Sequence, residues 1–194
     1  MRRIFTNPFL HLVTLLSLSL IAAGTSSAAG GRMADVAKTM LDNIDQTTWI
    51  SDGKSTHVVY IFFDPNCPYC HSTYLNTRDA VKNNTIEVRW IPVGILTATS
   101  FGKAASIMDA KDPLKAFYQN EDHYVRGEGG GGIDEALDGT EKTEKALKMN
   151  ADLLQLTGFN ALPSILFRDK NDQAVLIQGA PSPEKLKVIL QNIK

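Results

Sequence analysis

Two cysteines separated by two residues are the side chains of this chain whose type and spacing point most directly to chemistry. Cys67 and Cys70 are the only cysteines among the 194 residues. A Cys-x-x-Cys pair at the start of a helix can cycle between dithiol and disulfide, because unpaired N–H groups at a helix N-terminus stabilise a thiolate. The pair closes too short a loop to stabilise a fold appreciably. The spacing predicts thiol–disulfide exchange, with Cys67 as the more exposed nucleophile and Cys70 as the resolving thiol.

Four neighbours of the pair are candidates for tuning its redox properties. Pro68 and Tyr69 lie between the cysteines, His71 follows them and Asp64 precedes Cys67 by three positions. The dipeptide is expected to tune the reduction potential. His71 is expected either to favour the thiolate as an imidazolium or to face solvent. Asp64 is expected either to assist proton transfer to the resolving thiol or to end the preceding strand in a turn.

The elements before and after the pair predict how it is positioned. Residues 58–63 form a continuous apolar, β-branched and aromatic run, which favours a central strand covered on both faces. Asp64-Pro65-Asn66 ends this strand, and a helix begins at Cys67 with a proline in its first turn, where a missing N–H costs little. Residues 83–84, Asn-Asn, close the helix. Residues 86–95 predict a second strand.

A helical block is expected over residues 98–158. Asp112-Pro113 interrupts it, a helix is predicted at residues 140–157, and Gly158 suits a C-terminal cap. The glycine-rich stretch at residues 127–132 is expected to be a flexible loop or bare connector, since it lacks the context of a phosphate-binding loop.

The last part of the chain predicts a hairpin and a helix. Two strands, at residues 164–168 and 174–178, flank a polar turn, and Ser182 is the expected N-cap of a final helix. Leu162-Pro163 lies just before the first of these strands. If its peptide bond were cis, its backbone would lie beside the disulfide and pair with an incoming peptide.

The order of elements is βαβ, a helical block, then ββα, which is similar to a thioredoxin-like fold. We therefore predict an α/β thioredoxin-like domain over residues 55–194, with a helical insertion at about 98–158 between the βαβ and ββα halves. Residues 30–54 are expected to hold a helix that packs on the same domain, with apolar positions spaced helically over 33–46, and a polar turn at 47–54.

The N-terminus predicts export. Arg2 and Arg3 precede an apolar stretch at about residues 9–23, and small residues follow at 24–29, as in a cleaved signal peptide over residues 1–29. An uncleaved membrane anchor is the alternative. Either interpretation places the rest of the chain outside the cytoplasm, most simply in a bacterial periplasm, where an oxidising environment suits a chain whose only cysteines form this pair. The net charge of -1 gives no electrostatic case for binding nucleic acid.

The chain resembles the DsbC/DsbG branch of periplasmic disulfide isomerases, on its DsbG side. The resemblance covers residues 55–194 and rests on three segments: 63–70, Phe-Asp-Pro-Asn-Cys-Pro-Tyr-Cys; 93–95, Val-Gly-Ile; and 161–165, Ala-Leu-Pro-Ser-Ile. It implies a disulfide oxidoreductase or isomerase of cysteine-containing exported proteins, with Cys67 as nucleophile, Cys70 as resolver, Pro163 as a substrate-binding cis-proline and Leu162 beside the sulfurs. It implies no cofactor beyond the cysteines.

Two departures from that branch shape the expectations. About 27 residues separate the predicted cleavage site from the first strand, too few for the branch's N-terminal dimerisation domain, so a monomer is expected. Leu162 stands where these isomerases usually carry threonine, which is expected to alter potential and substrate choice. The protein could therefore also be an oxidase, or a reductase supplied by a membrane thiol donor. Its expected redox partner is a membrane protein of the DsbD or DsbB kind.

Three alternatives remain open at this stage. Cys67, Cys70 and His71 satisfy the CxxCH haem-attachment pattern of c-type cytochromes, with Met108 or Met149 as the opposite axial ligand. The same three residues could ligate zinc, although no second Cys/His pair would complete a closed site. A non-catalytic periplasmic binding or chaperone-like module could also keep the pair as a relic. Cytosolic glutaredoxins share Cys-Pro-Tyr-Cys, but the export signal and the insertion argue against that family.

Overall fold

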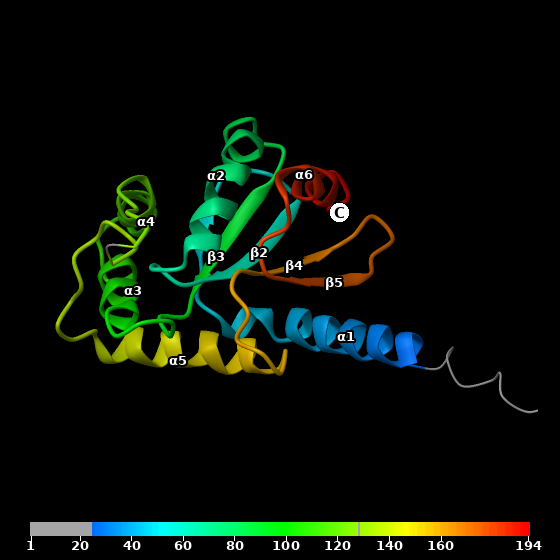
Figure 1. Ribbon diagram of the computed structural model, residues 1–194, viewed down its shortest axis with the longest axis horizontal. Helices are drawn as coiled ribbons and strands as arrows, with labels where there is room; N and C mark the ends of the chain where they lie inside the picture. The colour runs from blue at the N-terminus through cyan, green and yellow to red at the C-terminus, as the bar shows by residue number, and fades with distance from the viewer. Residues whose placement is uncertain (1–24, 128) are drawn as a thin grey trace, which may run out of the picture.

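A mixed five-stranded sheet forms the centre of the molecule (Figure 1). The computed structural model describes residues 25–194 except residue 128. The strands are β1 (Ile50–Asp52), β2 (Val58–Phe63), β3 (Glu87–Pro92), β4 (Ser164–Arg168) and β5 (Ala174–Gln178), arranged in the order β1-β3-β2-β4-β5. Strand β2 pairs parallel with β3 and antiparallel with β4, whereas β1–β3 and β4–β5 are antiparallel pairs. The fold is α/β and thioredoxin-like, as predicted.

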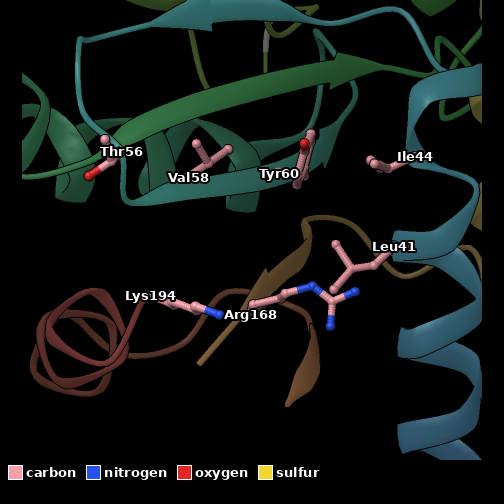
Figure 2. Close-up of a pocket in the computed structure, with 7 residues that line it drawn as sticks. All are labelled: Leu41, Ile44, Thr56, Val58, Tyr60, Arg168 and Lys194. Carbon is pink, nitrogen blue, oxygen red and sulfur yellow. The ribbon is translucent and has the colours of Figure 1, made fainter. Parts of the chain in front are cut away.

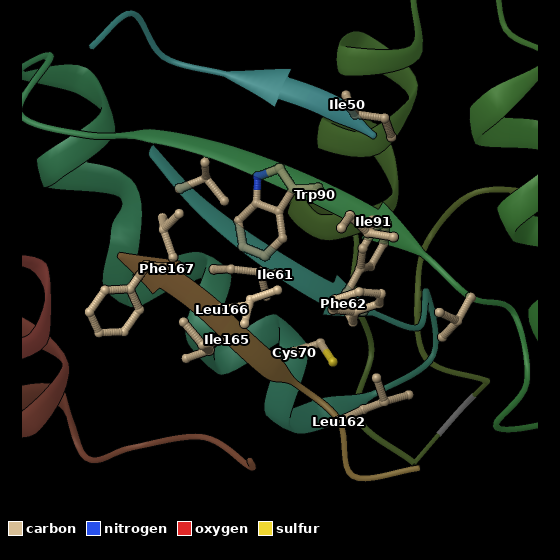
Figure 3. Close-up of a cluster of buried hydrophobic side chains, with 14 of the residues drawn as sticks. Ile50, Ile61, Phe62, Cys70, Trp90, Ile91, Leu162, Ile165, Leu166 and Phe167 are labelled. Carbon is tan, nitrogen blue, oxygen red and sulfur yellow. The ribbon is translucent and has the colours of Figure 1, made fainter. Parts of the chain in front are cut away.

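Strand β2 is the central element, and its composition explains why. Val59, Ile61 and Phe63 are fully buried on one face, and Phe62 is fully buried on the other. In the parallel register, Phe63 lies opposite Pro92 of β3, so both strands end at the same edge of the sheet. The segments that follow them, including the cysteine pair, meet at that edge. Figure 3 shows the buried side chains of the sheet, with Cys70 among them.

The polar residues 47–54 were predicted to be a turn, and this prediction was wrong. Residues 50–52 form strand β1, antiparallel to β3 with Ile50 opposite Trp90. Ile50 is buried. Asp52 is 1% exposed, and its buried carboxylate accepts hydrogen bonds from the side chains of Trp90 and Tyr118. A three-residue strand with one apolar and one acidic inward position shows too little apolar alternation to be recognised, which is why its sequence resembled a turn.

Helices cover both faces of the sheet (Figure 1). Helices α2 (Pro68–Lys82) and α6 (Pro183–Gln191) pack together on one face, while α1 (Thr25–Asp42) and α5 (Glu141–Gln155) run along the other. Helix α1 contacts β4 and β5, so the prediction that it packs on its own domain is confirmed. It ends before a short 3-10 turn, η1 (Ile44–Gln46).

The helical insertion consists of three helices, α3 (Ser100–Met108), α4 (Pro113–Asp122) and α5. Asp112 caps α4, accepting the backbone N–H of Lys115 at 3.0 Å, and Thr140 caps α5, accepting that of Thr143 at 3.2 Å. Helix α4 contacts β1, and α5 contacts β3. The insertion therefore packs directly on the edge strand β1 and on its neighbour β3.

The C-terminal half follows the prediction closely. The hairpin strands β4 and β5 have the predicted bounds, and Ser182 caps α6 by accepting the backbone N–H of Lys185 at 3.4 Å. Helix α5 ends at Gln155 with Leu156 as its C-cap, so the prediction that Gly158 is the cap residue was wrong; Gly158 follows two residues later with a positive φ of 76°. Most of the predicted signal peptide, residues 1–24, lies outside the described residues, and α1 begins at Thr25. Among the helices that the structure describes, none has the length and apolar character that crossing a bilayer requires.

Candidate redox site

Cys67 is the N-cap residue of helix α2. Pro68 occupies the first helical position, and the extended backbone of Cys67 (φ -79°, ψ 116°) aims its sulfur at the first turn. Its Sγ accepts the backbone N–H of Cys70 at 3.3 Å. The pKa of Cys67 is lowered chiefly by a hydrogen bond with the Cys70 thiol, and burial opposes this effect. The backbone N–H groups of Cys70 and Tyr69, at the start of α2, lower the pKa further. Cys67 is thus the thiol whose ionised form the helix stabilises.

Cys70 has the opposite electrostatic environment. It lies inside the first turn of α2 and packs in the core (Figure 3). Burial raises its pKa well above the ordinary value, and the neighbouring Cys67 and the charge of Glu121 act in the same direction. Exposure does not distinguish the two cysteines, since Cys67 is 3% and Cys70 2% exposed. The loop before β4 covers Cys67, so the predicted difference in exposure is small. The polar contacts of Cys67 and the deeper position of Cys70 in the core provide the asymmetry between the two thiols.

That covering loop contains Leu162 and Pro163. The Leu162–Pro163 peptide bond is cis, and Cys67 Sγ lies 3.7 Å from the carbonyl oxygen of Leu162. Leu162 is buried beside the sulfurs, and the carbonyl of Pro163 accepts the backbone N–H of Gly179 at 2.8 Å. The sheet pairing of β2 with β4 brings this loop, 95 positions away in the chain, onto the cysteines. The role of both residues in substrate binding stays a prediction.

Asp64 ties together the two loops that leave β2 and β3. Its Oδ1 accepts the backbone N–H of Asn66 at 2.9 Å and the hydroxyl of Ser100 at 2.7 Å. Its Oδ2 accepts the backbone N–H groups of Ile95 at 2.7 Å and Leu96 at 2.9 Å. With four donors engaged, this buried carboxylate is built to hold the turn, which favours the turn-forming alternative over a role in proton transfer.

His71 packs against the insertion rather than facing solvent. Its Nδ1 lies 3.0 Å from Oε2 of Glu121 on α4, and the His71 side chain is only 20% exposed. Its ring stacks on Tyr124 with a centroid distance of 4.4 Å and an interplanar angle of 10°. Sequence reasoning missed Glu121. The available signal was its spacing on α4. Glu121 follows the buried Phe117 by four residues, so it lies on the same buried face of the helix, where an apolar residue is expected.

The glycine-rich loop is packed against the site and is not the bare connector that was predicted. Lys103 donates to the carbonyl oxygens of Gly129 at 2.8 Å and Gly131 at 2.6 Å, and to the side-chain oxygen of Asn66 at 3.0 Å. A Cβ at Gly130 would lie 2.6 Å from the Asn66 Cα. The glycines are needed because this backbone approaches the residue just before Cys67 so closely.

Tyr69, the remaining residue of the predicted site, is 61% exposed and lies at the rim.

A cavity of about 540 Å³ lies at the opposite end of β2, between the end of α1, the start of β2 and the C-terminus (Figure 2). It is lined by Leu41, Ile44, Thr56, Val58, Tyr60, Arg168 and Lys194 and shares no residue with the cysteine site. Across the part of the chain that the structure describes, no three His, Cys, Asp or Glu side chains cluster as metal ligands would.

The sequence has relatives among known proteins. The chain is 34% identical over 163 residues to the thiol:disulfide interchange protein DsbG of Pseudomonas aeruginosa, covering 81% of this chain and 60% of that protein. It is 30% identical over 163 residues to DsbG of Escherichia coli, covering 82% and 63%. The chain thus spans less than two thirds of the length of these relatives.

Solved structures agree in fold. A linker-deletion variant of Proteus mirabilis ScsC matches with a TM-score of 0.69 at 18% identity, covering 87% of each chain. The thiol-disulfide exchange protein α-DsbA2 of Wolbachia pipientis matches with a TM-score of 0.62 at 18% identity, covering 83% of this chain and 97% of its own. The thioredoxin-like domain family matches residues 44–194, which include the whole sheet and the cysteine site. This protein therefore belongs to the thioredoxin-like domain family and resembles its DsbG members.

Proposed function

We propose that this protein is a thiol:disulfide oxidoreductase that acts on cysteines of other proteins through Cys67 and Cys70. The observation that carries the proposal is the opposite perturbation of the two thiols. Hydrogen bonding at the N-terminus of α2 lowers the pKa of Cys67, while burial raises that of Cys70. A thiolate is the attacking species in disulfide exchange, so this asymmetry assigns a separate role to each sulfur.

The reaction follows from this division of roles. The Cys67 thiolate attacks a substrate disulfide, its sulfur bonds to one substrate sulfur, and the other leaves as a thiolate. Cys70 then attacks Cys67, the mixed disulfide breaks, and the second substrate sulfur leaves while a Cys67–Cys70 disulfide forms. Run in reverse, the same steps donate a disulfide. Reductase or isomerase action and oxidase action therefore use the same geometry.

The surface around the cysteines supports a protein substrate. Tyr69, Leu96 and Val125 are exposed apolar residues on three segments that adjoin the turn before Cys67. Tyr69 belongs to the first turn of α2, and the backbone of Leu96 is held by Asp64. An extended cysteine-containing segment could bury its apolar side chains against them.

The signal-peptide pattern at residues 1–29 supports exported proteins as substrates and the periplasm as the location. A membrane thiol donor or acceptor of the DsbD or DsbB kind would then reset the pair. The haem alternative receives less support, because protein groups already contact Cys67 Sγ, the Cys70 N–H at 3.3 Å and the Leu162 carbonyl at 3.7 Å, and because Cys70 is buried in the core.

The first experiment is to equilibrate the purified protein in graded glutathione buffers and count free thiols. A reduction potential near about -120 mV would indicate a disulfide donor or an isomerase kept reduced by a dedicated donor, and one near about -270 mV a reductant. Cys67→Ser should abolish exchange with a disulfide-bonded protein substrate, and Cys70→Ser should trap mixed disulfides. A binding module would keep its activity in both variants, and cysteines blocked by a covalent group would overturn the proposal.

A further inference from the structure

The exchange function does not use the cavity of about 540 Å³ at the end of β2 that lies away from the cysteines (Figure 2). The cavity lies where the pairing of β2 with β4 stops. Val59 and Phe167 are the last residues paired at this end, although β2 begins one residue earlier, at Val58. The carbonyl of Arg168 instead accepts the backbone N–H of Lys194 at 2.9 Å, so the C-terminal segment borders the cavity.

One part of the cavity wall is apolar. It consists of Leu41, Ile44, Val58 and Tyr60. Two neighbours hold Tyr60 in place: its ring meets that of Trp49 edge-on at 5.8 Å, and its hydroxyl accepts from Nη1 of Arg89 at 2.7 Å. Ile44 is buried. This part of the wall is therefore preformed, as is usual for small-molecule sites, whose volumes run from about 300 to 1,000 Å³.

The other part of the wall is cationic and consists of Arg168 and Lys194. Figure 2 shows the Arg168 guanidinium reaching toward Leu41. The acidic partners of both cations are weakly held: Arg168 lies 3.8 Å from Asp42, and Lys194 lies 2.7 Å from Asp172, with all four side chains at least 40% exposed. Neither acid lines the cavity. Because exposed ion pairs contribute little, an anion inside the cavity can compete with these two acids.

We propose that this cavity binds a small amphiphile that carries one carboxylate head and an unbranched alkyl chain. The guanidinium of Arg168 can offer a carboxylate two parallel N–H donors, and Lys194 adds a point charge. The alkyl chain lies against the apolar part of the wall. A singly charged head suits the site better than a phosphate, because Asp42 and Asp172 already offset part of the positive charge. The inference goes beyond the exchange function and does not depend on it.

The test compares three molecules that share one alkyl chain and differ in the head group: octanoate, 1-octanol and octylammonium. Isothermal titration calorimetry measures their binding to the purified protein at low ionic strength, where charges are least screened. We expect octanoate to bind about tenfold more tightly than octanol, and octylammonium to bind most weakly. Heptanoate, one methylene shorter, should bind about fourfold more weakly than octanoate. Octanoate that does not bind, or that binds no better than octylammonium or octanol, would overturn the inference.

Two charge variants locate the head group. Arg168→Met keeps an apolar stem and removes the charge, so it should weaken octanoate binding about tenfold and leave octanol binding unchanged. The matched control is Lys187→Met, which removes an exposed cation from α6 outside the cavity and should leave the binding of both molecules unchanged. Equal losses in the two variants would mean a general attraction to positive surface and would also overturn the inference.

A filled cavity locates the alkyl chain. Val58→Trp should abolish the binding of octanoate and octanol, and Leu41→Trp replaces it if the first variant does not fold. Disulfide exchange with oxidised glutathione is the folding control, since the cavity shares no residue with the cysteine site. A folded, filled variant that still binds octanoate contradicts the proposed site. Wild-type protein that exchanges disulfides without binding octanoate would refute only this inference, and one that binds octanoate without exchange would refute only the exchange function.

Discussion

Helix α4 is joined to the sheet domain by two polar clusters that differ in the cation each contains. The distal cluster consists of Asp52, Arg78, Trp90 and Tyr118: Asp52 accepts from the Arg78 guanidinium, from Trp90 Nε1 at 3.1 Å and from the Tyr118 hydroxyl at 2.5 Å. The proximal cluster consists of Glu121, His71, Asn120 and Tyr124 and adjoins the cysteines. Both clusters bury a carboxylate under the same helix.

The difference is that the partner of Asp52 is an arginine, which stays protonated at all relevant pH values, whereas the partner of Glu121 is an imidazole, which is charged only when it is protonated. The distal carboxylate therefore has a permanent counterion, and Arg78 also stacks over Tyr74 and Tyr118 at 4.5 and 5.2 Å from the ring centroids. Such a cluster can fix the position of α4. Helix α4 of the insertion is thus anchored to the sheet through the distal cluster and supplies the titratable Glu121 to the proximal cluster.

The largest expected effect is on the distal cluster. Asp52→Ala would leave Arg78 buried without its counterion and remove the acceptor of Tyr118, so we expect a loss of about 3–5 kcal/mol in the free energy of unfolding. Urea denaturation followed by circular dichroism would measure it. The control is Asp42→Ala, which removes an exposed acid paired with Lys38 and should cost about 0–1 kcal/mol. Equal costs would contradict a structural role for this cluster.

Removing one tyrosine hydroxyl from each cluster tests the difference between the distal and proximal clusters. The Tyr118 hydroxyl donates to a buried carboxylate, and the Tyr124 hydroxyl donates to the neutral carbonyl of Asn66 at 3.0 Å. Hydrogen bonds to charged groups are the stronger, so we expect Tyr118→Phe to cost about 1.5–3 kcal/mol and Tyr124→Phe about 0.5–1.5 kcal/mol. Thermal or urea unfolding of both variants would show the order, and a reversed order would mean that the distal carboxylate does not depend on this donor.

The glycine loop tests how tightly the proximal cluster is packed. A Cβ at Gly131 would lie 1.9 Å from Oδ1 of the buried Asn120, which orients Glu121. We expect Gly131→Ala to cost about 1–3 kcal/mol through overpacking. Gly31→Ala is the control, because Gly31 lies in helix α1 with nothing within 4 Å of its added Cβ, and alanine should raise stability by about 0.5–1 kcal/mol there. Similar effects at both positions would show that the loop does not pack as described.

The pH dependence of stability is the smallest expected effect. Because burial raises the pKa of Glu121 in the folded state, its protonated form is favoured there, and this contribution is fully present below the pKa of the unfolded carboxyl, about 4.3. It is lost as pH rises through the higher folded pKa, by about 1.4 kcal/mol per unit of difference. Glu121→Gln should flatten this part of the stability profile, as measured by urea unfolding at a series of pH values. An unchanged profile would mean that a group other than Glu121 causes this part of the pH dependence of stability.

Local patterns explain what could be predicted. The run from Val58 to Phe63, the proline after Cys67, and the polar turn between β4 and β5 each carry their own signal, and the structure has those elements with nearly the predicted bounds. Strand β1 was missed because one of its two inward residues, Asp52, is polar. Its partners Arg78 and Tyr118 lie 26 and 66 positions away, and only their contacts make its burial tolerable.

The residues of the candidate site also divide into those that local sequence patterns predict and those that only tertiary contacts bring together. The pair of reactive thiols and the start of a helix at Cys67 could be predicted from the sequence, because the preceding strand, the cysteines and the proline are consecutive in the chain. Tertiary packing alone explains why Leu162 covers Cys67, why His71 turns inward, and why Glu121, 50 positions away, contacts His71. The physical reason is that helix caps and strands depend on neighbouring residues, whereas desolvation and charge pairing depend on whatever the fold packs against a group.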